Sequence, residues 1–402
     1  MASSLSTSSD SPPGDVLPPG CRLLKWGGMD LPVNLNECLE PWRDPSQYIS
    51  ALLVLAGTRT SEQEGISAAG VTPNSRRYTA IADAELLLTG SNDLRRWSLP
   101  PLPAGVTPAL ISQVACDLID LYPIILVTGL EIEIMPSFPH LRVEAIDLGP
   151  AACLGSGRAM SLERVEHLRC QGLHLVRHLR GPLLLTECVP GGTSTALAVL
   201  SGLGLSVENF VSGSARHPPQ QLKRRLVERG LASAKLARPI AADRLLAAVG
   251  DPFQALALGL LQGAWAHQRP VMLGGGSQMA AILALALYTR PAVLANSIAQ
   301  TLLVTTPWLA EEGGMEQLLQ QIAQRFCVIP TGLSSGLRFH HSDQALLRDY
   351  ERGFIKEGVG AGAFTLLAQL RGYSRQQLLQ ECENAVRQLK GAAASAPTSS
   401  TI

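Results

Sequence analysis

An acidic side chain directly precedes a glycine-rich segment near the carboxyl end of the sequence. Glu357 is followed by Gly358, Gly360 and Gly362, which alternate with small residues. Glycine lets the backbone approach a ligand closely and adopt positive φ. A carboxylate at the edge of such a loop can act as a general base. The alternative is a plain helix start, with Glu357 in the first turn and the glycines as an ordinary loop.

A second acid lies where a short apolar run meets a glycine turn. Leu183–Thr186 is followed by Glu187, then by Pro190, Gly191 and Gly192, and Thr193 can cap the next helix. The N–H groups at such a helix start can bind a phosphate. The segment has neither the Gly-Lys-Ser/Thr of a Walker A loop nor the dinucleotide fingerprint. Phosphate or sugar binding is the favoured interpretation, and a ligand-free turn is the alternative.

A third turn has the same design. The apolar run Pro270–Leu273 leads into Gly274, Gly275 and Gly276, and Ser277 can cap a helix that begins at Gln278. Three successive glycines cost backbone entropy, which argues against a purely structural turn.

Two further segments carry candidate ligand contacts. The polar loop 57–67 follows the run Ala51–Leu55 and can line a pocket or a solvated surface. Lys223, Arg224 and Arg225 lie on a predicted helix after residues 211–218, and a cation from it can neutralise a phosphate. A solvated basic helix face is the alternative.

The sequence gives little support for a metal site. His174 and His178 have the spacing of one helical turn but lack a third ligand nearby. The 8 cysteines form no Cys-x-x-Cys pair and are typical of reduced thiols. We therefore expect no metal and no cofactor.

Short apolar runs alternate with helical patterns along the chain, and a strand, a glycine turn and a helix recur. This order predicts an α/β fold with a doubly wound, mostly parallel sheet, Rossmann-like in three layers and with helical additions. Predicted helices include Thr193–Leu203, Pro219–Arg229, Pro252–His267, Gln278–Thr289, Met315–Arg325 and Arg375–Leu389. Predicted strands are Ala51–Leu55, Glu85–Leu88, Ile124–Thr128, Arg142–Asp147, Leu183–Thr186, Asn209–Val211, Pro270–Leu273, Thr301–Thr305 and Cys327–Ile329.

Composition agrees with a large hydrophobic core. Of the 402 residues, 46% are hydrophobic and 16% are charged, with a formal net charge of zero. A neutral chain has no general attraction for nucleic acid or anionic membrane. No apolar run reaches the ~18 residues of a membrane span, so we expect a cytoplasmic protein. Residues 1–20 and 391–402 are expected to be disordered tails around one domain, 21–390.

Taken in order, these segments resemble the nicotinate-nucleotide–dimethylbenzimidazole phosphoribosyltransferase family (CobT type), and more closely its divergent cyanobacterial and archaeal branch. The family's Glu-x-Gly-x-Gly-Asn-Thr is similar to 187–193, its Gly-Asp-Pro helix start to 250–252, its Pro-Val-x-x-Asp-Gly-Phe to 270–276, and its Gly-Glu-Gly-x-Gly-Ala to 356–361. The match spans roughly residues 50–370. The chain departs from the pattern at Gly192, at 274–276 and at 57–59, where the family has Gly-Asp-His.

The resemblance implies transfer of ribose 5-phosphate from nicotinate mononucleotide to an aromatic base, giving an α-ribotide for the lower ligand of a cobamide. Glu357 would be the general base, and Glu187 a polar contact near the base or ribose. It also implies a homodimer. The acceptor stays open between dimethylbenzimidazole and a purine such as adenine. Residues expected to hold the substrates or phosphate are Glu187, Gly191, Gly192, Thr193, Gly275, Gly276, Ser277, Gln278, Gly358 and Lys223.

Two rival functions use the same features. One is another nucleotide- or sugar-phosphate-using transferase with the same glycine turns. The other is a binding or regulatory protein that kept the fold without the chemistry. Catalysis requires Glu357 to face the cleft formed by the two earlier glycine turns, whereas a binding protein tolerates Glu357 pointing away.

Overall fold

The computed structural model describes residues 16–27, 34–91, 95–131, 133, 136–211, 213, 215–289 and 294–395. Within them, strands form one sheet in the order β1-β8-β7-β6-β5-β2-β3-β4, parallel except where β1 meets β8. The strands are β1 Arg22–Leu23, β2 Ser50–Ala56, β3 Ile124–Thr128, β4 Leu141–Arg142, β5 Leu183–Cys188, β6 Val271–Gly274, β7 Thr301–Thr305 and β8 Thr331–Ser334.

The direction of strand addition reverses at β2. From β2 the chain adds β3 and then β4 on one side, and it returns to place β5 on the other side of β2. Leu52 of β2 therefore lies between Ile124 of β3 and Leu185 of β5. Open α/β sheets bind their ligands at such a switch point, beyond the carboxyl ends of the strands.

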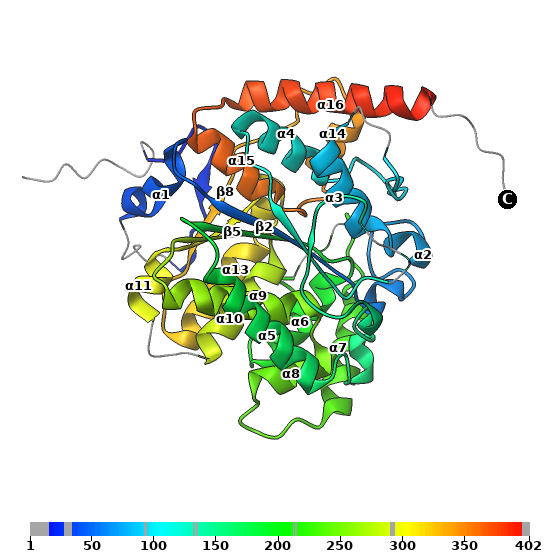
Figure 1. The fold of residues 1–402 in the computed structure, drawn as a ribbon, viewed down its shortest axis with the longest axis vertical. Helices are drawn as coiled ribbons and strands as arrows, with labels where there is room; N and C mark the ends of the chain where they lie inside the picture. The colour runs from blue at the N-terminus through cyan, green and yellow to red at the C-terminus, as the bar shows by residue number, and fades with distance from the viewer. Residues whose placement is uncertain are drawn as a thin grey trace, which may run out of the picture.

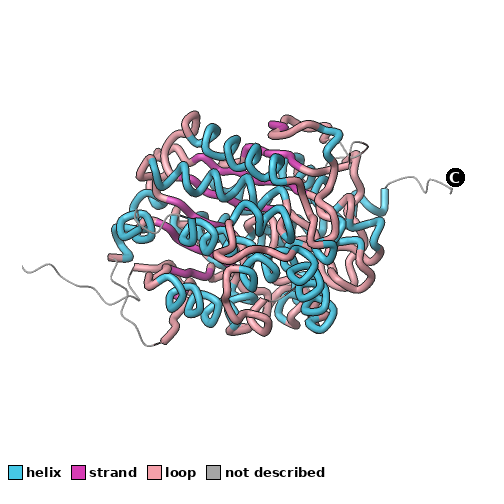
Figure 2. The backbone as a smooth tube through the Cα atoms, turned by 90° about the horizontal axis from the view of Figure 1, so that it is seen from below, coloured by secondary structure: helices cyan, strands magenta, loops and turns pink. Residues whose placement is uncertain are grey.

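Helices cover both faces of the sheet, so the molecule has three layers (Figures 1 and 2). Side chains of β2 alternate between the two faces, with Leu52 and Val54 in one core and Leu53 and Leu55 in the other. The α9 face is covered by α5 Leu162–Val176, α6 Gly192–Gly202, α7 Gln220–Ala234, α8 Ala242–Val249, α9 Pro252–Ala266, α10 Ser277–Thr289, α11 Leu294–Ala299 and α13 Gly314–Phe326. The α4 face is covered by α1 Leu35–Arg43, α3 Thr79–Thr89, α4 Ala109–Ile119, α14 Ala345–Glu351, α15 Ala361–Leu370 and α16 Arg375–Ser395.

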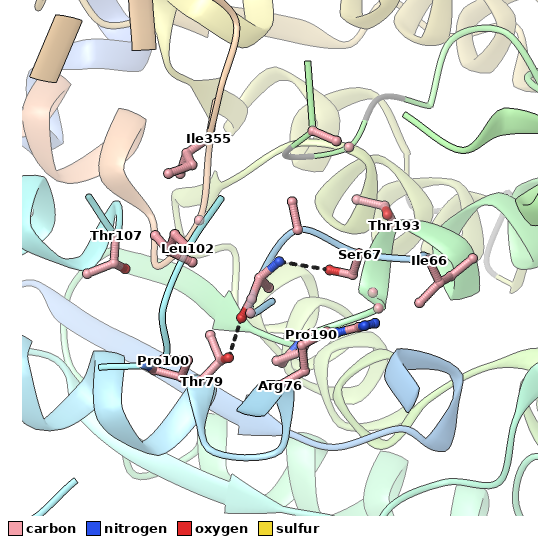
Figure 3. Close-up of a pocket in the computed structure, with 18 of the residues that line it drawn as sticks. Ile66, Ser67, Arg76, Thr79, Pro100, Leu102, Thr107, Pro190, Thr193 and Ile355 are labelled. Carbon is pink, nitrogen blue, oxygen red and sulfur yellow. Dashed lines mark hydrogen bonds between the residues drawn. The ribbon is translucent and has the colours of Figure 1, made fainter. Parts of the chain in front are cut away.

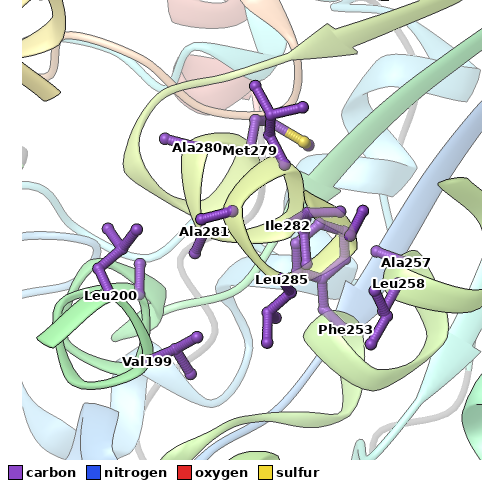
Figure 4. Close-up of a cluster of buried hydrophobic side chains, with 14 of the residues drawn as sticks. Val199, Leu200, Phe253, Ala257, Leu258, Met279, Ala280, Ala281, Ile282 and Leu285 are labelled. Atoms are coloured by element: carbon purple, nitrogen blue, oxygen red, sulfur yellow. The ribbon is translucent and has the colours of Figure 1, made fainter. Parts of the chain in front are cut away.

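Small residues let the helices on the α9 face pack closely. In Figure 4, α10 lies between α6 and α9, with Ile282 near Phe253 and Leu285, and with Val199 and Leu200 on the other side. Every described residue of α10 from Ser277 to Leu287 is buried. Such a fully buried helix explains the high aliphatic and low charged content of the sequence.

The α/β fold with a mostly parallel, doubly wound sheet is confirmed, as are the five central strands. Four strand predictions were wrong. Glu85–Leu88 belongs to α3, in which every residue from Thr79 to Leu87 is buried. A helix buried on all sides shows an unbroken run of apolar residues, as a buried strand does, so the sequence pattern did not separate the two. Of the predicted strand Arg142–Asp147, Arg142 alone belongs to a strand, as the second residue of β4.

The other two errors are in chain turns. Residues 208–210 form a turn, and Val211 belongs to no strand. Cys327 ends α13 in the left-handed conformation, with φ 54°, and strand β8 starts later, at Thr331.

All six predicted helices are present, with ends shifted by a few residues. The helix α16 continues to Ser395, into the segment expected to be a tail, because alanines favour helix. At the other end, Val16 and Leu17 pack against the core of the α4 face. Residues 1–15 and 396–402 of the expected tails lie outside the described residues.

Candidate active site

A cavity of about 710 Å³ opens beyond the carboxyl ends of β2 and β5, at the switch point of the sheet. Its lining comes from residues 64–73 after β2, 99–108 before α4, 187–193 after β5, and 355–359 before α15 (Figure 3). The loop after β2 is held in place by Arg76, whose buried guanidinium donates to the carbonyl oxygens of Ser61 and Gln63 at 2.6 and 3.1 Å. The loop predicted to line a pocket or a surface thus contributes to the cavity.

The larger part of the cavity wall is apolar. In Figure 3, Leu102 and Ile355 lie on one side, and Ile66 and Pro190 lie across from them. Flat aromatic rings suit such walls, because burying their faces removes apolar surface from water. Further apolar residues of the wall are Val71, Leu99, Pro100, Pro103, Val106, Pro108, Val189 and Val359.

Glu357 lies at the boundary between this cavity and a smaller one of about 60 Å³. One carboxylate oxygen accepts from Thr305 Oγ1 at 3.0 Å and from the backbone N–H of Thr306 at 2.7 Å. The other accepts from the N–H groups of Gly358 and Gly362 at 3.1 and 3.3 Å. Burial outweighs these donors and raises the pKa of Glu357 to about 7. A group with this pKa can accept a proton near neutral pH.

The backbone on both sides of Glu357 is strained. Ile355 and Val359 have φ angles of 50° and 54°, a region that β-branched residues rarely adopt. Their side chains are buried, which holds the segment in this conformation. Strain of this kind concentrates at functional sites, where surrounding packing fixes a reactive group.

Glu187 is the last residue but one of β5, lies near Glu357 and lines both cavities. Burial, and then the neighbouring charges of Asp251 and Glu357, raise the pKa of Glu187 to about 8. The backbone carbonyl of Glu187 accepts from the N–H of Val359 at 3.1 Å. This bond joins the loops that carry the two carboxylates.

Two buried lysines share these cavities with the carboxylates, Lys223 in the larger one and Lys356 in the smaller one. Lys223 Nζ donates to Thr193 Oγ1 at 3.0 Å, and burial, with the nearby charge of Lys356, lowers the pKa of Lys223 to about 8. Lys356 pairs with Glu312 and donates to the carbonyls of Gly213 and Ala215, both at 3.3 Å. Arg224 and Arg225 are exposed, so among these three cations of α7 the cavity receives Lys223.

The starts of α6 and α10 meet the same region. Gly191 precedes α6 with φ 84°, a conformation that favours glycine. A Cβ on Gly192 would lie 2.6 Å from Gln278 Nε2, so a side chain there would displace the Gln278 amide. Thr193 lines both cavities, and Gly276 and Ser277 line the smaller one. Two helix N-termini and two lysines form a site suited to an anion.

The predicted site residues thus gather at one place, with two qualifications. Gly275 is absent from the described lining of both cavities, although its φ of 155° shapes the turn. Gln278 lines the smaller cavity, but its amide donates to Asp251 at 2.8 Å and accepts from Gln254 at 2.8 Å. Asp251 also caps α9 and accepts from Thr195, so this network fastens α6, α9 and α10 together.

Sequence reasoning missed Asp83 of α3. This side chain is 4% exposed and lines the larger cavity. One of its oxygens accepts from Thr107 Oγ1 at 2.7 Å, and the other faces the Cys188 thiol at 3.7 Å. Burial raises the pKa of Asp83 to about 7. An acid flanked by Ala82 and Ala84 within an apolar helix was the available signal.

Among the described residues, no group of three or more His, Cys, Asp or Glu side chains is arranged to hold a metal ion. None of the helices in the described ranges combines the length and the apolar character that a membrane span requires.

The chain is similar to curated proteins over nearly its whole length. A UPF0284 protein of Parasynechococcus marenigrum (strain WH8102) is 53% identical and covers 94% of this chain and 96% of its own length. A UPF0284 protein of Nostoc (strain PCC 7120) is 39% identical, over 84% of this chain and 92% of the relative. No protein-family model matches the sequence.

Two solved structures from Thermus thermophilus share the fold. CobT superposes with a TM-score of 0.56 at 19% identity, covering 88% of this chain and 92% of that one. A nicotinate-nucleotide-dimethylbenzimidazole phosphoribosyltransferase gives 0.55 at 18% identity, covering 89% and 92%. The expected resemblance is confirmed at the level of the fold: the chain belongs to the UPF0284 family, and its fold is that of the CobT structures.

Proposed function

We propose that the protein transfers a phosphoribosyl group from nicotinate mononucleotide to an aromatic base. The product is an α-ribotide for the lower ligand of a cobamide. The observation that carries the proposal is the position of Glu357, which lines both the larger, mostly apolar cavity and the smaller cavity beside the starts of α6 and α10. This arrangement favours a transferase over a binding protein, because it puts a poised carboxylate between a place suited to aromatic rings and a place suited to a phosphate.

The apolar cavity would hold the two aromatic rings, and the anion site would hold the ribose phosphate. Phosphate would meet Lys223, Thr193, Gly276 and Ser277 at the starts of α6 and α10. Lys356 lines the smaller cavity and adds positive charge on the same side. Binding energy on the phosphate would position the anomeric carbon near Glu357.

In the proposed reaction, one ring nitrogen of the base attacks the anomeric carbon. The bond from that carbon to the nicotinate nitrogen breaks, and its electron pair stays on nicotinate, which neutralises the quaternary ring nitrogen. The other ring nitrogen of the base loses its proton to Glu357. With its pKa near 7, Glu357 is deprotonated often enough at neutral pH to accept this proton.

Chromatography of nicotinate and ribotide tests the proposal. The purified protein is incubated with nicotinate mononucleotide and, separately, with dimethylbenzimidazole or adenine. We expect the wild type to form a ribotide and Glu357→Gln to lose at least about 100-fold in rate. The matched control is Glu163→Gln, on α5 outside both cavities, which should keep the wild-type rate.

Two outcomes would contradict the proposal. Equal rates in the wild type and in Glu357→Gln would remove Glu357 as the base. Nucleotide binding without nicotinate release, with either acceptor, would favour the binding-protein alternative. The homodimer and the cytoplasmic location expected from the sequence belong to the same proposal, and sedimentation equilibrium tests the former.

A further inference from the structure

The acid Asp83 occupies a different part of the large cavity from the other two carboxylates. Glu187 and Glu357 line both cavities, whereas Asp83 lines only the larger, apolar one. Asp83 comes from α3 on the α4 face of the sheet, and Lys223 comes from α7 on the α9 face. A ring bound in the cavity with its ribose on the anion side would therefore turn its far edge toward Asp83.

The surroundings of Asp83 leave capacity for a ligand hydrogen bond. A carboxylate can accept about four hydrogen bonds. Within the described part of the chain, Glu357 receives four, and Asp83 receives one strong bond, from Thr107 Oγ1 at 2.7 Å. Its second oxygen has the Cys188 thiol at 3.7 Å, and thiols are weak donors.

Burying this acid is costly for the fold. A buried carboxyl without a full set of donors is destabilising, and its raised pKa expresses that cost. Leucine has nearly the shape of aspartate and would fit an apolar wall with no such cost. Thr107, which donates to Asp83, also lines the cavity, so both members of this polar pair lie at the cavity wall.

We propose that Asp83 selects the acceptor base by accepting a hydrogen bond from an N–H or O–H group on the edge of its ring. The inference rests on the proposed function and narrows its substrate class. The site favours aromatic bases with an amino or hydroxyl substituent over bases whose edge bears only hydrogen or methyl groups. A site with a buried polar group rejects a ligand that leaves the group unpaired.

The test compares benzimidazole, aminobenzimidazole, hydroxybenzimidazole and dimethylbenzimidazole as acceptors, with nicotinate mononucleotide as donor. We expect the wild type to prefer the amino or the hydroxyl compound over benzimidazole by about tenfold or more in kcat/KM. The double variant Asp83→Leu/Thr107→Val removes both polar partners while keeping their shapes. The preference should then fall to about one.

A matched control is Asp117→Leu, the same change at an exposed position of α4 outside the cavity. It should leave the preference unchanged. The proposal would be overturned if the wild type and the double variant showed the same preference in kcat/KM for the amino or hydroxyl compound over benzimidazole. If circular dichroism shows that the double variant does not fold, the test uses the wild type alone. The proposal is then overturned if kcat/KM for the amino or hydroxyl compound exceeds that for benzimidazole by less than about twofold.

Calorimetric titration separates failure of this inference from failure of the proposed function. Each base is titrated into the protein without turnover. In one outcome, aminobenzimidazole binds more tightly than benzimidazole, the double variant loses this difference, and no base gives a ribotide. This outcome would support Asp83 as the edge contact and reject the transferase. Ribotide formation from every base with equal binding in both proteins would reject the role of Asp83 and leave the transferase intact.

Discussion

At the scale of single residues, Glu357 combines many hydrogen-bond donors with a raised pKa. Four donors would normally hold a carboxylate well ionised, but burial prevails and brings the pKa to about 7. A base of this strength is partly protonated at neutral pH, so its activity must depend on pH within the physiological range.

We expect kcat/KM to fall about tenfold per pH unit below about 7 and to level off above it, because only ionised Glu357 can accept the proton. Thr305→Val removes one donor to the charged form, so the pKa of Glu357 rises and the inflection moves to higher pH. Rate profiles from mildly acidic to mildly alkaline pH would measure both. A flat profile, or an inflection that Thr305→Val does not move, would contradict Glu357 as the base.

Lys223 is the cation whose removal should weaken binding of the phosphate. Lys223→Met keeps the buried stem and loses the ammonium group beside Thr193. We expect the KM for nicotinate mononucleotide to rise about 10-fold or more, with a smaller change in kcat. Arg224→Met, one residue further along α7 and exposed, is the control and should behave as wild type. Equal effects of the two changes would mean that Lys223 has no special role.

Residue types revealed part of this site in advance. Glu187 and Glu357 were predictable because each acid stands next to a glycine turn, an unusual place for a purely structural carboxylate. Asp83 was not, since an acid within a helical pattern normally faces water. Its burial depends on how α3 packs against β5 and the segment before α4, which is long-range information. The same holds for choosing Lys223 over Arg224.

At the scale of elements, the approach of α15 to the end of β7 positions Glu357. Gly362 makes this possible, because a Cβ there would lie 2.1 Å from the carbonyl carbon of Thr305. Because of this close packing, the N–H of Gly362 donates to one carboxylate oxygen of Glu357. The hydroxyl of Thr305, at the end of β7, donates to the other oxygen. The glycine run of this segment therefore serves helix packing as well as ligand approach.

We expect Gly362→Ala to lower the free energy of unfolding by about 3 kcal/mol, because backbone must move to admit the methyl group. Gly391→Ala is the matched control. Nothing lies within 4 Å of its Cβ position in α16, so it should stabilise by about 0.5–1 kcal/mol. Urea unfolding of the two variants measures the difference. Similar stabilities would show that α15 can shift at little cost.

Predictability differs among the elements for a physical reason. The strands β2, β3, β5, β6 and β7 are short apolar runs bounded by turn residues, and the sequence predicts them well. Helix α3 was misread because burial on all sides erases the helical period. The start of β8 was misplaced because the left-handed end of α13 at Cys327 has no glycine to mark it.

At the scale of the whole molecule, one cavity gathers Asp83, Glu187 and Glu357 at the switch point of the sheet. That the chain returns to place β5 beside β2 comes from the topology, and no local pattern in the sequence announces it. The fold therefore buries three carboxyls in one place and raises the pKa of each, to about 7, 8 and 7 respectively.

This burial should make the protein less stable as the pH rises. Each acid has a folded-state pKa above its ordinary value of about 4, so between about pH 4.5 and 8 the folded state holds protons that the unfolded chain has released. The free energy of unfolding then falls as the pH rises through this window. The contribution of the acids is fully present below about pH 4 and is lost by about pH 8.

Glu187→Gln isolates one of the three groups, because glutamine keeps the shape and cannot ionise. We expect this variant to gain about 1–3 kcal/mol over wild type at about pH 8.5 and almost nothing at about pH 5. Guanidinium unfolding at both pH values gives the comparison, with Glu163→Gln on α5 as the control that should match wild type at each pH. An equal gain at both pH values would mean that the variant acts through packing, and a loss at the higher pH would mean that the ionised carboxylate has a protein partner that stabilises it.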